Sequence, residues 1–162
     1  ATHPTVTGEP SDFRLPRQLD QRRGVGHYQH VRVGRGGIEP GRESRKTRPI
    51  ALHDPTAHAE VQAIRAAAIK QCNYRLPGST LYVTLEPCTM CAGAILQARI
   101  ERVVFATTDP RSGAVESQFQ LLNHAEFNHR CRVDSGPLAA QSAALLKQFF
   151  RKRRNSPSTR VS

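Results

Sequence analysis

Two short motifs carry side chains that can bind metal ions or move protons. The first, HAE at residues 58–60, stands where an apolar segment begins, and the second, PCTMC at residues 87–91, follows a run rich in Thr, Leu and Val. Cysteines at positions i and i+3 of a helix lie on one face, so both sulfurs can reach one ion. Zn²⁺ prefers thiolate and imidazole ligands. The spacing therefore predicts a zinc site made by His58, Cys88 and Cys91.

Three protein ligands leave a tetrahedral zinc ion one position for water, which is typical of catalytic sites. The metal lowers the pKa of such a water, and Glu60 is placed to act as the general base that carries its proton to a leaving amine. H-x-E followed by P-C-x-x-C is typical of zinc-dependent nucleobase deaminases. Two alternatives remain at this point: the cysteines could form a redox pair, or His53, His124 or His129 could complete a closed structural site.

The apolar pattern around these motifs predicts alternating helices and strands. Val61, Ile64 and Ala68 recur at helical spacing, with Thr56 as the N-cap residue of their helix, whereas residues 79–85 alternate as a buried strand does. From these patterns we expect helices at 57–71, 88–98, 117–123 and 138–154, and strands at 79–85, 102–106 and 130–133. The chain should therefore adopt an α/β fold in which helices cover a sheet.

The length and the apolar content limit the classes of protein to which the chain can belong. A chain of 162 residues is expected to form one domain with a substantial core. No apolar run approaches the length of a membrane span, and none resembles a signal peptide. We therefore expect a cytoplasmic protein with no membrane partner, in which cysteines favour thiolate chemistry over disulfides.

The net charge of +11 is concentrated at the two ends of the sequence. Residues 1–48 hold 10 Lys and Arg against 5 Asp and Glu, residues 49–146 hold 8 against 8, and residues 147–162 hold 6 against 0. A basic end on a neutral body indicates a polyanion as partner, because each phosphate contact releases condensed counterions. A solvated basic tail that only keeps the protein soluble is the alternative.

Three longer stretches resemble one family closely. They read HDPTAHAEVQAIR (53–65), NYRLPGSTLYVTLEPCTMCAGAILQARIERVVFAT (73–107) and ALLKQFFRKRR (144–154). Together they resemble the bacterial tRNA-specific adenosine deaminases, a branch of the zinc-dependent cytidine/deoxycytidylate deaminase superfamily. The resemblance covers about residues 48–154. It implies a three-layer α/β/α sheet and a homodimer with one Zn²⁺ per subunit, which converts the wobble adenosine of a tRNA anticodon into inosine by hydrolysis.

The resemblance also implies a role for each matching residue. His58, Cys88 and Cys91 match the zinc ligands, and Glu60 matches the residue that shuttles the proton. Residues that match the substrate side are Ala59, Glu86 and Pro87 at the base pocket, Asp109 beside the RNA backbone, and Phe150, Arg151, Arg153 and Arg154 near the anticodon loop.

Residues 1–47 depart from this resemblance. They are rich in Arg, Gly and Pro, so we expect a poorly structured segment, followed by a deaminase domain at 48–154 and a disordered tail at 155–162. Thr47 stands where the family has an asparagine that helps to hold the nucleoside. One hypothesis is that the segment is read in a shifted frame, and the other is a divergent extension. Under either hypothesis we expect the deaminase activity to be impaired.

Two other functions share these features. A guanine or cytosine deaminase of the same superfamily would carry the same zinc motif, although the basic cluster at 151–154 favours an RNA substrate. A catalytically weak, zinc-stabilised RNA-binding module is the third hypothesis, and replacement of Glu60 separates it from an enzyme.

Overall fold

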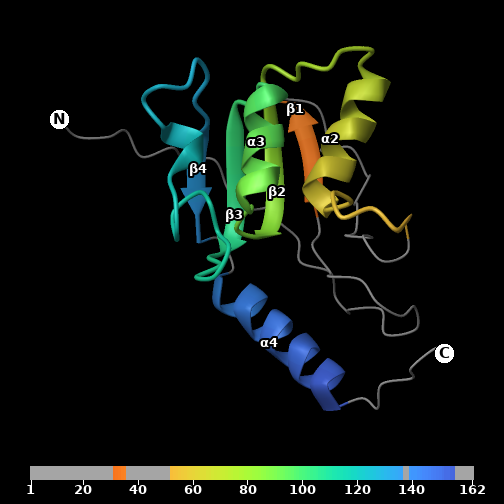
Figure 1. The fold of residues 1–162 in the computed structure, drawn as a ribbon, viewed down its shortest axis with the longest axis vertical. Coiled ribbons are helices and arrows are strands. Elements are labelled where there is room, and N and C mark those ends of the chain that lie inside the picture. Colours follow the sequence, from red (N-terminus) through yellow and green to blue (C-terminus); the bar gives the residue numbers. More distant parts are fainter. Residues whose placement is uncertain (1–30, 36–51, 137–138, 156–162) are drawn as a thin grey trace.

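A four-stranded sheet forms the centre of the computed structural model, which describes residues 31–35, 52–136 and 139–155 (Figure 1). The strands lie in the order β1-β2-β3-β4, with bounds β1 Val31–Arg35, β2 Ser79–Leu85, β3 Arg102–Thr107 and β4 Arg132–Ser135. β1 pairs with β2 in the antiparallel sense, and the other two pairs are parallel. Parallel neighbours need a crossover connection. The helix α3 (Thr89–Gln97) supplies it between β2 and β3.

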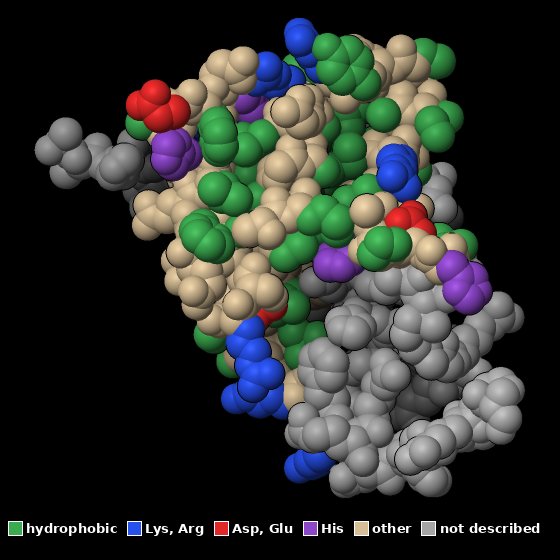
Figure 2. Space-filling view, in the orientation of Figure 1, with side chains coloured by type: hydrophobic (Ala, Val, Ile, Leu, Met, Phe, Trp, Pro, Cys, Tyr) green, Lys and Arg blue, Asp and Glu red, His purple; other side chains and the backbone are tan. Residues whose placement is uncertain are grey.

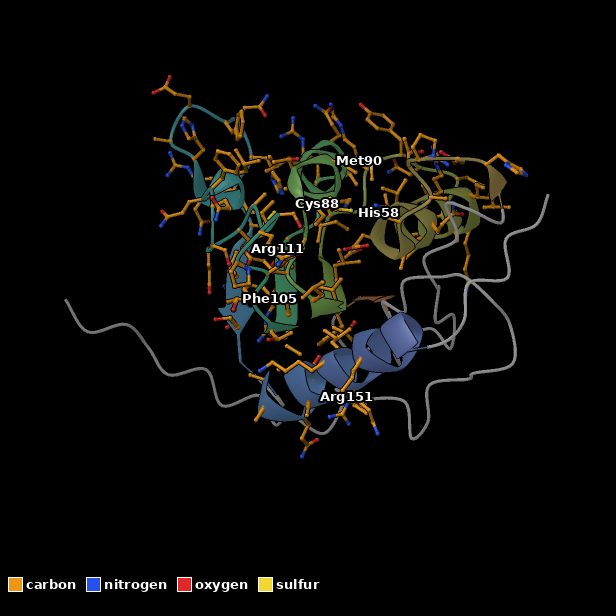
Figure 3. The ribbon with its side chains drawn as sticks, turned by 60° about the horizontal axis from the view of Figure 1, so that its bottom comes forward. His58, Cys88, Met90, Phe105, Arg111 and Arg151 are labelled. Atoms are coloured by element: carbon orange, nitrogen blue, oxygen red, sulfur yellow. The ribbon has the colours of Figure 1, made fainter. Side chains whose placement is uncertain are left out.

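Helices cover both faces of this sheet. α2 (Ala59–Lys70) packs beside α3 on one face, and α4 (Ala139–Asn155) lies on the opposite side, where it contacts β3 (Figure 3). The hydroxyl of Ser142, buried on α4, donates to the carbonyl of Thr84 on β2 at 2.9 Å. The predicted α/β/α layering is therefore confirmed.

The core lies where these layers meet. In β3, Val103, Val104, Phe105 and Ala106 are all buried, because a parallel strand covered on both faces has no solvent side. Ile95 of α3 is also fully buried and belongs to the same cluster. This core holds the carboxyl end of β2 and the first turn of α3 in place, and the cysteine motif lies there.

Part of the segment expected to be poorly structured forms a strand. β1 falls within residues 1–47, and Val31 pairs with Val83 while Val33 pairs with Leu81. Isolated valines among glycines give too weak a pattern to predict a strand, which here comes from pairing with the buried β2. The remaining residues of 1–47, among them Thr47, lie outside the described residues, as do residues 156–162. The hypothesis of a shifted reading frame concerns these residues and stays a hypothesis.

Two further differences from the predicted elements are larger than one residue at an end and lie between β3 and α4. The helix expected at 117–123 is only a 3-10 turn, η2 (Leu121–Asn123), and β4 begins two residues later than expected. The first difference has a tertiary cause: the backbone N–H groups of Glu116 and Ser117 bond to the carboxylate of Glu86. They are therefore held by a distant side chain before a helix begins.

The face that carries α2 and α3 exposes hydrophobic side chains (Figure 2). Ile69 on α2 is 78% exposed, and Tyr74, just after it, is 67% exposed. Among the described residues, no helix has the length and apolar character that crossing a bilayer requires.

Candidate metal centre

Three predicted ligands converge where two helices begin. His58 is the N-cap residue of α2, Cys88 is the N-cap residue of α3, and Cys91 lies in the first turn of α3 (Figure 3). His58 Nδ1 lies 3.7 Å from Cys88 Sγ and 3.6 Å from Cys91 Sγ, and the three ligand atoms all lie within 4.8 Å of one another. The site predicted from spacing is thus assembled by the fold.

A short turn ahead of α2 sets the position of His58. The Asp54 carboxylate accepts hydrogen bonds from the backbone N–H of Thr56 at 2.8 Å and from its hydroxyl at 2.7 Å. The N–H of His58 then donates to the carbonyl of Thr56 at 2.7 Å. The prediction that Thr56 is the N-cap residue was wrong, because its hydroxyl is bound to Asp54. His58 occupies that position, and its side chain faces the sulfurs and makes no capping bond.

The separations between these atoms fit a zinc ion. Zinc bonds of about 2.0–2.1 Å to nitrogen and about 2.3 Å to sulfur, in a tetrahedron, place nitrogen and sulfur ligands about 3.6 Å apart. The measured N–S distances of 3.6 and 3.7 Å agree with that spacing. Two sulfurs and one imidazole are also the donor set that zinc prefers.

The cysteines differ in protonation. A hydrogen bond from the Cys91 thiol lowers the pKa of Cys88 to about 4, against the opposing effect of burial and with help from His58. The same bond, together with burial, raises the pKa of Cys91 well above its usual range. The hydrogen bond with Cys88 also raises the pKa of His58. Because metal ligands must be deprotonated, binding of a cation here releases protons.

Glu60 is a buried acid beside this cluster. It is the second residue of α2 and is fully buried. Burial raises the pKa of Glu60 to about 7, and His58 and Cys88 act on it electrostatically. A group with a pKa near neutral pH can both take and return a proton. The predicted general base is therefore next to the predicted ligands.

The histidines that could have closed the site lie elsewhere. His129 Nε2 is 2.8 Å from the carbonyl of Ile100, and His124 Nδ1 accepts from the N–H of Glu126 at 3.3 Å. His53 is exposed on the turn before α2. Among the described residues, only His58, Cys88 and Cys91 form such a group. A three-ligand site remains, which leaves a tetrahedral ion one further position.

The residues predicted to line the base pocket are buried. Ala59, Glu86 and Pro87 have almost no exposed surface. The carboxylate of Glu86 accepts hydrogen bonds from the loop 109–117, a role that the sequence did not indicate. Gly113 was also missed, although an alanine there would overlap that carboxylate.

The other predicted substrate contacts are Asp109 and four residues of α4. Asp109 is partly buried, and its carboxylate accepts from the N–H groups of Arg111 and Ser112 at 3.0 and 3.3 Å. Arg151 is exposed on α4, across the sheet from His58 (Figure 3). The side chains of Phe150, Arg153 and Arg154 lie outside those described, although the helix α4 continues through them.

Known proteins resemble this chain along most of its length. The MafB19-like deaminase family matches residues 33–154, so the match begins inside the segment expected to depart from the family. The tRNA-specific adenosine deaminase of Agrobacterium fabrum is 43% identical over 138 residues, which are 84% of this chain and 91% of that protein. That of Haemophilus influenzae is 53% identical over 105 residues, 65% of this chain and 61% of the relative.

Solved structures of deaminases also resemble this chain in fold. A structure from a study of A-to-I editing by tRNA:A34 deaminases at the wobble position has a TM-score of 0.65 and 39% identity, and the match covers 72% of this chain and 83% of that one. A guanine deaminase from Nitrosomonas europaea has a TM-score of 0.60 at 23% identity, with 75% of this chain and 71% of that one covered. The second likeness shows a shared fold.

Proposed function

Because this chain belongs to the tRNA-specific adenosine deaminases, we propose that it hydrolyses the amino group from the wobble adenosine of a tRNA anticodon and leaves inosine. The observation that carries the proposal is the group of His58, Cys88 and Cys91 with the buried acid Glu60 beside it. The chain spans 61% of the Haemophilus relative and 91% of the Agrobacterium relative.

The proposed cofactor is one Zn²⁺ per subunit, held by His58, Cys88 and Cys91. The distances between the ligand atoms and the donor set support this choice. When bound, zinc supplies Lewis-acid chemistry and makes a water nucleophilic at neutral pH.

The proposed role of Glu60 is to move one proton. Its carboxyl group is buried, and its pKa of about 7 allows it to accept a proton while the adenine is attacked and to return it to the departing amine. The amino group then leaves as ammonia. Burial also keeps bulk water from exchanging that proton before it is delivered.

The proposed substrate contacts follow the family resemblance. Ala59, Glu86 and Pro87 would form one wall of the base pocket, with Asp109 beside the RNA backbone. On α4, residues Phe150, Arg151, Arg153 and Arg154 would contact the anticodon stem-loop. The charge of residues 147–162, with six Lys and Arg and no acid, supports an RNA phosphate backbone as their partner.

The RNA contact can be tested at one exposed arginine. Arg151→Ala should weaken binding of an anticodon stem-loop and reduce the slope of log affinity against log salt by about one. Lys70, exposed at the end of α2, is the matched control, and Lys70→Ala should leave that slope unchanged. Equal slopes in the two variants would count against α4 as the RNA-binding helix.

We include a homodimer and a cytoplasmic location in the proposal. The exposed hydrophobic side chains on the face of α2, among them Ile69, support a partner subunit there. The proposed tRNA substrate supports a cytoplasmic location. Light scattering after size-exclusion chromatography tests the dimer, and a mass of one subunit would exclude it.

The decisive experiment uses an anticodon stem-loop with adenosine at the wobble position. Inosine should form with the zinc-loaded protein, disappear after chelation and return when zinc is added back. A stem-loop with guanosine at that position is the matched control. Free guanine and free cytosine are assayed in parallel, and turnover of either, without inosine in the RNA, would reject the proposal in favour of a small-molecule deaminase.

A further inference from the structure

The carboxylate of Glu86 is buried between the end of β2 and the loop 109–117. Glu86 is 1% exposed. Its Oε1 accepts from the backbone N–H groups of Val115, Glu116 and Ser117 at 3.0, 2.7 and 2.9 Å. Its Oε2 accepts from the N–H of Asp109 at 2.9 Å and from the hydroxyl of Ser117. Five donors from one loop therefore meet a single side chain, an arrangement we call the loop anchor.

The same loop also contacts the two residues that follow Glu86. The N–H of Ala114 donates to the carbonyl of Pro87 at 2.9 Å, and Gly113 pairs with Cys88 in an isolated antiparallel bridge. Three consecutive residues, 86–88, are thus tied to the loop, and the last of them carries a predicted ligand atom. A shift of the loop would be transmitted directly to Cys88.

Gly113 shows how closely the loop approaches the carboxylate. A Cβ atom at this position would lie 2.2 Å from Glu86 Oε2 and 2.6 Å from Oε1, far inside contact distance. Only a residue without a side chain allows the backbone to come this near. The close approach is a feature of the loop anchor, because the other glycines within residues 52–136, Gly78, Gly93 and Gly136, have no neighbour within 4 Å of the same position.

We propose that Glu86 is a positioning residue, whose carboxylate holds the loop 109–117 against the Cys88 turn and so keeps the metal site and Asp109 in fixed relation. The inference rests on the metal-binding part of the proposed function. Groups that orient a metal ligand without touching the ion typically change metal affinity by about 10- to 100-fold when they are replaced. Glu86 acts in this way through the backbone that leads to Cys88.

An amide at this position would break the anchor selectively. A glutamine has one acceptor oxygen and one NH₂ donor in place of two acceptor oxygens. If its oxygen keeps the three N–H groups of residues 115–117, its NH₂ group must face the N–H of Asp109. The hydroxyl of Ser117 can rotate and accept, but a backbone N–H cannot. Glu86→Gln therefore releases Asp109 and removes the charge that the other donors bind.

The test compares Glu86→Gln with Glu116→Gln, which makes the same chemical change on an exposed side chain of the same loop. Hydrogen exchange of peptides covering 109–117 should be faster in Glu86→Gln, while peptides of α2 remain as in the wild type. Zinc affinity, measured by competition with a chelator, should fall about 10-fold or more. The visible spectrum of the cobalt-substituted protein should change. Glu116→Gln should match the wild type in all three.

Faster loop exchange with zinc affinity within about twofold of the wild type and an unchanged cobalt spectrum would overturn the inference, and so would unchanged exchange. If Glu86→Gln does not fold, Ser117→Ala carries the test, because it removes one donor and leaves the carboxylate in place. Faster exchange at Asp109 with weaker zinc binding supports the inference, and faster exchange alone overturns it. None of these readouts needs deamination, so a wild-type chain that binds zinc but forms no inosine would reject only the proposed function.

Discussion

Replacement of Gly113 by alanine would place a methyl group inside the space of the Glu86 carboxylate. The new Cβ would lie 2.2 Å from Oε2 and 2.3 Å from Cδ. The contact is made by a buried group with five donors around it, so the carboxylate cannot swing into solvent without losing hydrogen bonds. We therefore expect Gly113→Ala to lower the free energy of unfolding.

The magnitude follows from the hydrogen bonds. Each bond to a charged acceptor contributes about 1.5–3 kcal/mol. If the carboxylate moves far enough to lose two of its five bonds, the loss is about 3–6 kcal/mol. A protein of this size loses roughly 2–4 °C of Tm per kcal/mol, so Tm should fall by about 6 °C at least. Circular dichroism during heating, with zinc present at fixed concentration, measures this change.

Gly93→Ala is the matched control, because it is the same substitution at a glycine of α3 with no neighbour within 4 Å. An alanine inside a helix should stabilise it by about 0.5–1 kcal/mol. The two variants should thus shift Tm in opposite directions. A Tm for Gly113→Ala equal to or above that of the wild type would refute the close packing against Glu86. The double variant Glu86→Ala, Gly113→Ala should show that the two losses are not additive, because the clash is absent once the carboxylate is removed.

Three further predictions concern other parts of the molecule. Glu60→Gln should retain zinc, measured by metal analysis, but lower inosine formation by about 10²-fold or more, as expected for a lost general base; retained turnover would assign the proton transfer elsewhere. In the zinc-loaded protein, exposed Cys72 should react with a thiol reagent at pH 8, whereas Cys131 should not, since it is buried and burial raises its pKa to about 11. Chelation should expose one more reactive thiol, that of Cys88, whose pKa is lowered to about 4, whereas Cys91 is buried and its pKa is raised. Ser142→Ala should destabilise the fold by about 1 kcal/mol because it removes a hydrogen bond to β2. Ser79→Ala should be neutral or stabilising, since the buried Ser79 hydroxyl has no hydrogen-bond partner among the described residues. Equal effects of the two substitutions on Tm would contradict both assignments.

Much of the fold could be predicted because its signals are local. β2 was predicted at 79–85 and is found there, and α3 and β3 differ from prediction by a residue or so. These elements follow from the period of apolar residues, which depends only on near neighbours in the chain. β1 could not be predicted in this way, because its few valines form a strand only by pairing with β2.

The candidate zinc ligands could also be predicted from local sequence patterns. His58, Cys88 and Cys91 were identified from residue type and spacing, since a metal site needs particular donor atoms at helix positions that face one another. The sequence alone therefore determined which side chains could bind zinc and which acid stood beside them. It could not exclude His129 as a fourth ligand, which required knowing that its ring reaches the carbonyl of Ile100.

Only the tertiary structure decided what the second acid of the site does. Glu86 precedes Cys88 by two residues and resembled a pocket residue, yet its carboxylate binds N–H groups 23 to 31 positions later in the chain. No periodicity records such contacts, because they depend on how a loop returns across the end of a strand. The same holds for Gly113, an ordinary loop glycine in the sequence, which the structure places against that carboxylate.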